Sequence, residues 1–198
     1  MTTGTVIVLI LTAILVLGGI VCMTIYNRLV GLRQRVLNAF AQIDVQLKRR
    51  HDLVPNLVEA VKGYMVHERE TLERVTQARN LAVTTLATTD PKQGTAVATL
   101  ASAENELVAA LKGLMILKEG YPQLKADANA RQLMEELSST ENRVAFARQS
   151  YNDSVMLYNT ARQKFPAVLL AGIMGFPEAQ LFGIENASER EVVNVELG

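Results

Sequence analysis

The stretch QIDVQLKRRHDLVPN, residues 42–56, places three consecutive basic residues, a histidine and a proline inside what otherwise follows the pattern of one amphipathic helix. Apolar residues spaced by about seven are typical of a helix that packs lengthwise against another helix. One position departs from that pattern, because Arg50 stands where Leu, Val or Ile is expected. The row reads Leu29, Val36, Ile43, Arg50, Leu57 and Tyr64.

Upstream of this helix lies an unbroken run of apolar, Thr and Gly residues, VIVLILTAILVLGGIVCMTI at residues 6–25. Its length matches the ~20 residues that a helix needs to cross a bilayer. A cleaved signal peptide is the alternative, but no basic residue precedes the run and no small-x-small cleavage site follows it. A lipoprotein would use Cys22, yet Val21 stands where a small residue is needed. We therefore expect a single-pass membrane anchor.

The charges around the anchor predict its orientation. None of the first 27 residues is charged, whereas six basic residues follow between Arg28 and Arg50. Because basic flanks stay in the cytoplasm, we expect a protein of the inner (cytoplasmic) membrane with its N-terminus outside and its bundle in the cytoplasm. The expected division is an anchor at residues 1–27, a helical bundle at 28–165, and an apolar C-terminal segment with a tail at 166–198.

Three more helices are predicted after the first one. The third is expected over about residues 95–119 and the fourth over about residues 126–164. Strand-like alternation of apolar and polar residues is absent before the last dozen residues, so we expect no sheet in the bundle. Short connections make consecutive helices antiparallel. The predicted fold class is therefore all-α: an N-terminal transmembrane helix continuing into an up-down antiparallel four-helix bundle with long first and last helices. The helix-breaking strings are KGYMVHE at 62–68, TTDPKQG at 88–94 and GYPQL at 120–124.

The unequal helix lengths predict self-association. At ~1.5 Å per residue the outer helices reach about 55 Å and the middle pair about 35 Å, so the outer pair projects toward the membrane as a stalk. Apolar seams on this stalk have no third or fourth helix to cover them, and exposed seams of that kind bind other copies. We expect a homo-oligomer whose seam consists of Leu29, Val36, Phe40, Tyr151, Tyr158 and Phe165.

A polar layer is predicted inside the bundle. Counting from the membrane-distal turns places Arg50, Glu104 and Glu141 at one height, each in an apolar row. Because an unpaired charge there would cost several kcal/mol, we expect Arg50 to bind one or both carboxylates, with His51 bordering the network. Such a layer fixes which helices pair and in which register. The alternative is a surface kink flanked by solvated charges.

Pro55 adds irregular backbone beside these charges. It lacks an N–H, and its ring crowds the carbonyl of His51. Either the helix kinks at Pro55, or Asp52 caps a new helix that has Pro55 in its first turn.

Few residues offer catalytic chemistry. Sixteen residues of continuous helix would place His51 and His67 about 160° apart around the axis, too far to share a metal. The sequence has no glycine-rich phosphate loop, nucleophile elbow or Ser-His-Asp arrangement. The formal net charge is zero and the basic string at 48–51 lacks interleaved aromatics, which gives no case for a nucleic acid partner. We expect no enzyme and no cofactor, and we assign no catalytic, cofactor-binding or metal residue.

The C-terminal segment AVLLAGIMGF, residues 167–176, is too short to cross a bilayer. It is predicted to lie in the lipid interface, to fill the base of an oligomer, or to fold as a cap under its own bundle. The string EVVNVEL at residues 191–197 is either one short strand or loose.

Two long blocks carry a family resemblance: residues 26–68, from YNRLVGLRQ to GYMVHE, and residues 136–166, ELSSTENRVAFARQSYNDSVMLYNTARQKFP. With the anchor before them and the FP-rich tail after them, the chain resembles bacterial LemA family proteins. The resemblance implies a single-pass anchor, a helical bundle and no established enzymatic activity or cofactor. The family also includes a protein implicated in forming magnetosome membranes. The string LFGIENASE at residues 181–189 departs from the family, which has more aromatics there.

Three functions are compatible with these features. The first is a non-enzymatic scaffold that binds membrane lipid, homo-oligomerises and organises or remodels the membrane. The second is an adaptor that presents its bundle to another membrane protein, such as a protease. The third is a metal-binding protein that uses His51 or His67 with acidic neighbours.

Overall fold

The computed structural model describes residues 3–183, and these residues form helices and connecting segments without any strand. Four helices are long: α1 has 60 residues, α2 has 20, α3 has 24 and α5 has 36. The predicted all-α fold class is confirmed. In chain order the elements are α1 (Thr3–Lys62), α2 (Arg69–Thr88), α3 (Gly94–Leu117), the 3₁₀ turn η1 (Lys118–Gly120), α4 (Pro122–Ala126), α5 (Ala128–Gln163) and α6 (Ala167–Leu170).

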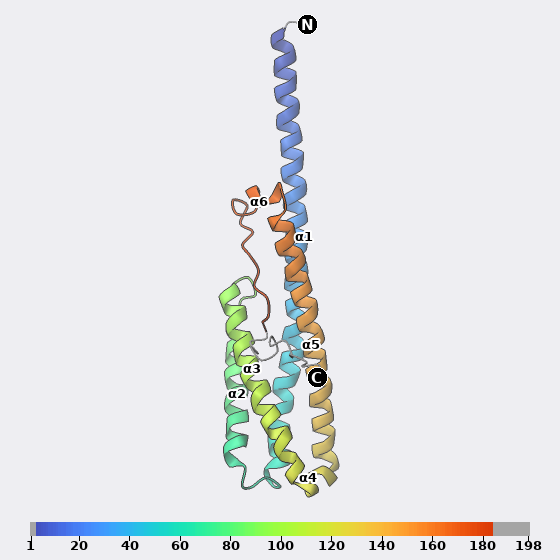
Figure 1. Ribbon diagram of the computed structural model, residues 1–198, viewed down its shortest axis with the longest axis vertical. Helices are drawn as coiled ribbons and strands as arrows, with labels where there is room; N and C mark the ends of the chain where they lie inside the picture. Colours follow the sequence, from blue (N-terminus) through green and yellow to red (C-terminus); the bar gives the residue numbers. More distant parts are fainter. Residues whose placement is uncertain (1–2, 184–198) are drawn as a thin grey trace, which may run out of the picture.

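The four long helices form the predicted up-down antiparallel bundle (Figure 1). α1 packs along α5, α2 packs along α3, and α1 also packs against α2, whereas α3 and α5 approach each other less closely. The short α2 and α3 cover only one end of the α1–α5 pair, here called the distal half. The part of the pair nearer the apolar start of α1 is the proximal half, which α2 and α3 reach only with residues at their near ends, such as Leu86 and Leu100.

The distal connections are fixed by side-chain hydrogen bonds. Asp127 caps α5, because its carboxylate accepts from the backbone N–H of Ala130 at 2.8 Å. The hydroxyl of Tyr64, in the turn after α1, donates to the other oxygen of Asp127 at 2.8 Å. The Ala130 N–H bond and the Tyr64 bond lower the pKa of Asp127. The fourth predicted helix therefore begins at Ala128, after the separate short helix α4.

The start of α1 has no protein cover. α1 is the one helix among residues 3–183 that is long and apolar enough to cross a membrane, and its most apolar window is exposed throughout. Large apolar side chains between Val6 and Val21 are exposed and do not pack against the bundle. Such a surface belongs in hydrocarbon rather than in water.

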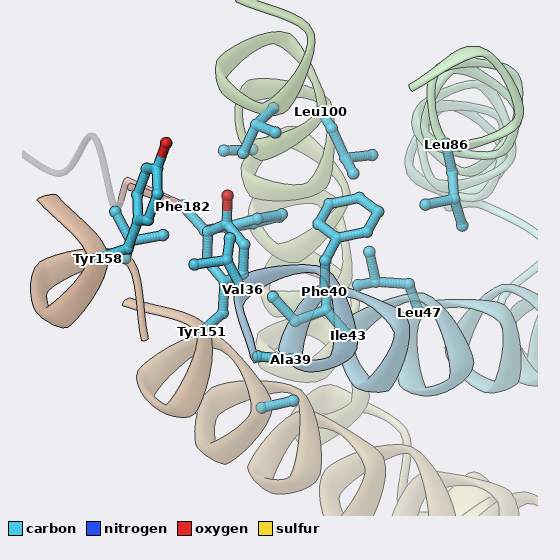
Figure 2. Packing of buried hydrophobic residues seen from close by; sticks show 14 of the residues in the cluster. Val36, Ala39, Phe40, Ile43, Leu47, Leu86, Leu100, Tyr151, Tyr158 and Phe182 are labelled. Atoms are coloured by element: carbon cyan, nitrogen blue, oxygen red, sulfur yellow. The ribbon is translucent and has the colours of Figure 1, made fainter. Parts of the chain in front are cut away.

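Buried apolar side chains form two clusters along the bundle axis. The distal core joins all four long helices and includes Val54, Leu57, Val75, Leu107 and Leu137. The proximal core, shown in Figure 2, includes Phe40, Ile43, Leu100, Tyr151 and Phe182. Both clusters use the same faces of α1 and α5, but the proximal one recruits a segment that is not helical.

That segment is residues 176–183, here called the strap. After α6 the chain turns at residues 171–175, where Gly175 has a φ of 73°, and runs back beside α5 toward the start of α3 (Figure 1). Its side chains Phe176 and Phe182 are 1% and 0% exposed. A Cβ at Gly94 would lie 3.1 Å from Cβ of Gln180, so the strap also packs closely on the first residue of α3.

The strap overturns the predicted oligomer seam. It covers the apolar face of the α1–α5 pair where α2 and α3 do not reach, so the uncovered stripe on which that seam rested is not present. Only Phe165 is exposed as expected, at 80%. The seam residues that are instead buried within their own chain are Leu29, Val36, Phe40, Tyr151 and Tyr158.

Candidate functional site: a buried polar layer and a clamped strap

A layer of charged side chains separates the two cores. Arg50 and His51 on α1 and Glu104 on α3 are almost fully buried, at 1%, 3% and 1% exposed. The side chain of Glu141 on α5 completes the layer and is one third exposed. The structure therefore brings together all four residues of the predicted layer, from three helices.

Arg50 is the hub of this layer. Its Nη1 lies 2.9 Å from both carboxylate oxygens of Glu141, and its Nη2 donates to Oε2 of Glu104. His51 Nε2 lies 2.9 Å from the other oxygen of Glu104. Because an ionised carboxylate can only accept, Nε2 carries the proton in this contact. Both Glu104 oxygens are thus bonded to α1.

The electrostatics of Glu104 follow from these neighbours. Burial by itself would raise the pKa of its carboxyl, but the hydrogen bond from His51 and the charge of Arg50 outweigh burial and hold that pKa below its usual value. Glu104 is therefore ionised at neutral pH. A buried ion pair of this kind adds little net stability compared with apolar packing, but removing one partner leaves the other charge unpaired.

Pro55 lies inside α1, which continues unbroken to Lys62, so no new helix begins at Asp52. Because proline has no N–H, the carbonyl of His51 loses its usual helical partner. Nε of Arg79 on α2 donates to that carbonyl at 3.1 Å. Arg79 thereby links α2, the one long helix not yet represented, to the layer. The sequence indicated that Pro55 lacks an N–H, but it did not identify Arg79 as the donor that replaces it.

The strap is held by its backbone. Asn152 accepts from the N–H of Phe182 at 2.8 Å and donates to the carbonyl of the same residue at 3.3 Å. Asn159 likewise accepts from the N–H of Ala179 at 3.1 Å and donates to the carbonyl of Ala179 at 2.8 Å. Other α5 side chains donate to four more strap carbonyls: Arg162 to Phe176 at 2.9 Å, Tyr158 to Pro177 at 2.7 Å, Tyr151 to Gln180 at 2.9 Å and Arg148 to Gly183 at 3.2 Å.

The two tyrosines remain protonated donors at neutral pH. Burial raises the pKa of Tyr151 to about 12. Burial also raises the pKa of Tyr158, against the opposing charges of Arg162 and Arg33. Their rings are buried within their own chain, and their hydroxyls bind the strap. The asparagines at the same spacing, Asn152 and Asn159, were the overlooked signal.

A groove of about 820 Å³ opens between α3 and α5 in the distal half. Apolar side chains from both helices form its floor, among them Leu111, Met115 and Leu137, and Lys112 and Arg131 flank it. Glu141 also borders this groove, so the layer has one open edge. His67 is exposed, and among residues 3–183 no three His, Cys, Asp or Glu side chains converge as metal ligands would.

Comparisons with known proteins show which family and which relatives the chain is similar to. A model described as LemA family matches residues 39–197. The chain is 24% identical over 189 residues to the magnetosome protein MamQ of Magnetospirillum gryphiswaldense. The aligned region covers 87% of this chain and 70% of that protein. It is 32% identical over 88 residues to the magnetosome proteins MamQ 1 and MamQ 2 of Paramagnetospirillum magneticum, covering 44% of this chain and 32% of each relative.

These similarities and the apolar start of α1 describe a membrane-associated protein of the LemA type. Since the family model spans most of the sequence, from the middle of α1 through the strap, the chain belongs to the LemA family.

Proposed function

We propose that this protein is a non-enzymatic membrane scaffold that touches the bilayer twice, through the span of α1 and through a second apolar surface at the end of α5. This second surface, here called the foot, carries the proposal. It consists of four exposed large side chains on and beside α6: Phe165, Val168, Leu169 and Ile173. Ile173 is 86% exposed, which is unfavourable for an isoleucine in water.

The height of the foot supports lipid contact. The ring of Phe176 lies 5.5 Å from that of Tyr26, the residue that follows the apolar run of α1. Ile173 is three residues from Phe176, so it lies within about 10 Å of that level. Cys22 and Ile25, in the last turn of the run, are already partly covered. The foot therefore lies at the level where the span would leave the hydrocarbon.

Basic residues surround the same level. Arg28 and Arg35 on α1 and Lys164 at the end of α5 are on or near the surface, and the guanidinium of Arg33 lies 4.9 Å from the ring of Phe176. Lys and Arg at this depth bind anionic headgroups at about 1 kcal/mol each. They also support the orientation with the N-terminus outside and the bundle in the cytoplasm of a bacterial inner membrane.

Two membrane contacts on one rigid bundle restrict its tilt. An anchored helix alone leaves the bundle free to lean, whereas a foot inserted beside the span fixes the bundle axis. Copies held in one orientation can associate side by side, and wedge-like insertion beside each span expands one leaflet. Scaffolding and membrane remodelling follow from this arrangement without any catalytic group.

The test uses the absence of tryptophan from the sequence. Ile173→Trp places one fluorescent reporter in the foot, and Val66→Trp places a matched reporter at the distal end, where Val66 is 69% exposed. In vesicles that contain anionic and brominated lipids, we expect strong quenching at position 173 and little at 66. Equal quenching at the two positions would remove the foot from the membrane and with it the scaffold proposal.

The α3–α5 groove favours a second candidate, an adaptor that binds another membrane protein. Its apolar floor and mixed-charge rim suit an amphipathic helix of a partner. Met115→Asp would place a charge on that floor. An adaptor predicts loss of a stoichiometric partner in this variant while vesicle binding persists, and a scaffold predicts no change in either.

A further inference from the structure

We propose that the strap is exchanged between copies, so that residues 176–183 of one molecule occupy the α5 face of a second copy of this chain. The inference rests on the proposed scaffold function and names the contact that would join its subunits. Exchange of an identical element is a low-cost route to assembly, because each copy keeps every contact that it had when closed.

The α5 face recognises an extended chain and not a particular fold. Strap residues 176 and 183 bond to Arg162 and Arg148, which are fourteen positions apart on α5. Fourteen helical residues rise about 21 Å, so seven strap residues advance about 3 Å each, as extended backbone does. The same register explains the asparagine pairs, since Asn159 and Asn152 are seven apart and hold strap residues three apart.

Two side chains supply what specificity there is. Phe182 packs at 6.5 Å from the ring of Tyr151, with the guanidinium of Arg148 at 4.7 Å from its own ring. Phe176 packs between Tyr26 and Arg33. The occupant is therefore an extended segment with aromatic residues six positions apart. FPEAQLF at residues 176–182 is such a segment, and every copy carries one.

Membrane anchoring brings a neighbour's strap into register. The face that binds the strap begins within a few residues of the span, at Tyr26, so all copies in one bilayer present face and strap at the same depth. This confinement raises the effective concentration of the strap for neighbouring faces. The turn at residues 171–175 has five residues and can extend over about 17 Å without unwinding α6, which exceeds the ~10 Å spacing of packed helices.

Exchange is also self-enforcing. A copy that gives up its strap uncovers part of the apolar proximal face, including Val36 and Tyr151, and that exposure is relieved by a strap from another copy. An opened copy has a face without a strap and a strap without a face. A second opened copy of this chain supplies both missing partners at once.

The principal experiment is a complementation between two defective chains that carry different tags. The first chain stops after residue 170 and has a face without a strap. The second is full-length with Asn152→Ala and Asn159→Ala, and has a strap without its asparagine clamp. In mild detergent we expect the two together to co-purify at least tenfold more than either with itself. Mixed pairs no more abundant than the self pairs would overturn exchange.

A second arm uses the intact protein in vesicles, in case the shortened chain does not fold. Leu181 is partly exposed in the strap, so Leu181→p-benzoylphenylalanine places a photoreactive group there with little disturbance. We expect irradiation to join differently tagged copies through α5, and the same group at Val66 to give no such product. Crosslinks found only within single chains would overturn the proposal. The foot experiment is independent of this result, so the scaffold function would stand or fall separately.

Discussion

The proximal and distal halves of the bundle use the same two helices and close them in different ways. In the distal half, α2 and α3 cover α1 and α5 with apolar side chains, and the helices bond most of their own backbone groups. The His51 carbonyl, which Pro55 leaves without a helical partner, accepts from Arg79 instead. In the proximal half, α2 and α3 contribute only residues at their near ends, such as Leu86 and Leu100, and one extended strap covers the rest. An extended segment has no internal hydrogen bonds, so its buried N–H and C=O groups need partners from outside.

The polar side chains of α5 follow from that difference. Where α5 faces helices, its inner positions are apolar residues such as Leu137 and Val144. Where it faces the strap, asparagines, tyrosines and arginines are placed to bond the strap backbone. The lesson is that a row of polar residues beside a core face can indicate an irregular segment of the same chain.

The largest expected effect comes from the layer between the halves. Glu104→Leu leaves Arg50 buried with only the partly exposed Glu141, and we expect a loss of about 3–5 kcal/mol in the free energy of unfolding. Denaturant titration in mild detergent, followed by helical circular dichroism, measures the loss. Glu106→Leu, two residues away at a less buried position, is the control. Equal stability of the two variants would show that the layer is not closed as described.

The next effect distinguishes the strap from an adhering tail. Phe182→Ala removes a fully buried ring and should cost about 3 kcal/mol. Phe146→Ala on α5 removes a ring that is 72% exposed and should change stability by less than about 0.5 kcal/mol. Thermal unfolding of both variants gives the comparison. A similar small shift for both would mean that the proximal core does not need the strap.

The backbone clamp gives a smaller effect. Asn159→Ala leaves both backbone groups of Ala179 without their side-chain partner, and the expected cost is about 1–3 kcal/mol. Asn142→Ala removes an exposed asparagine from the same helix and is the matched control. Chemical denaturation gives the unfolding midpoint of each variant. Equal midpoints for Asn159→Ala and Asn142→Ala would contradict a stabilising role of Asn159 in holding the strap.

Arg79 and Pro55 should be coupled by about 1 kcal/mol. Arg79→Met removes the donor to the His51 carbonyl, which Pro55 cannot supply. Pro55→Ala restores a helical N–H, so Arg79→Met should cost less in that background. A double-mutant cycle measures the difference. Additive effects would mean that Arg79 does not replace the missing bond.

Acid should weaken the layer gradually. The folded pKa of Glu104 lies below its usual value, so the native state binds fewer protons than the unfolded chain in the acid range. The stability it contributes is present above the usual carboxyl pKa and is lost as pH falls toward the lowered folded pKa. Urea midpoints measured from pH 6 downward should fall more steeply for the wild type than for Glu104→Gln. Parallel slopes would contradict this electrostatic account.

Sequence patterns predicted the helices and the polar layer, because heptad spacing and charges in apolar rows are local signals that translate directly into height along a bundle. Arg50, Glu104 and Glu141 were placed by counting residues from the turns. The strap was not predicted as the seam's cover, because an irregular segment has no period and its partners on α5 are distant in sequence. The tyrosines Tyr151 and Tyr158 were therefore interpreted as contacts between copies. The string at residues 191–197 lies outside the described residues.

The central claim is that the proximal half is closed by backbone hydrogen bonds to the strap, and amide hydrogen exchange tests it most directly. In the full-length protein in detergent, the amides of Ala179 and Phe182 should exchange at least a hundredfold more slowly than in an unstructured peptide of the same sequence. Asn152→Ala with Asn159→Ala should remove that protection while the amides of α2 and α3 remain slow. Exchange of residues 179 and 182 at the unstructured rate in the wild-type protein would contradict the account.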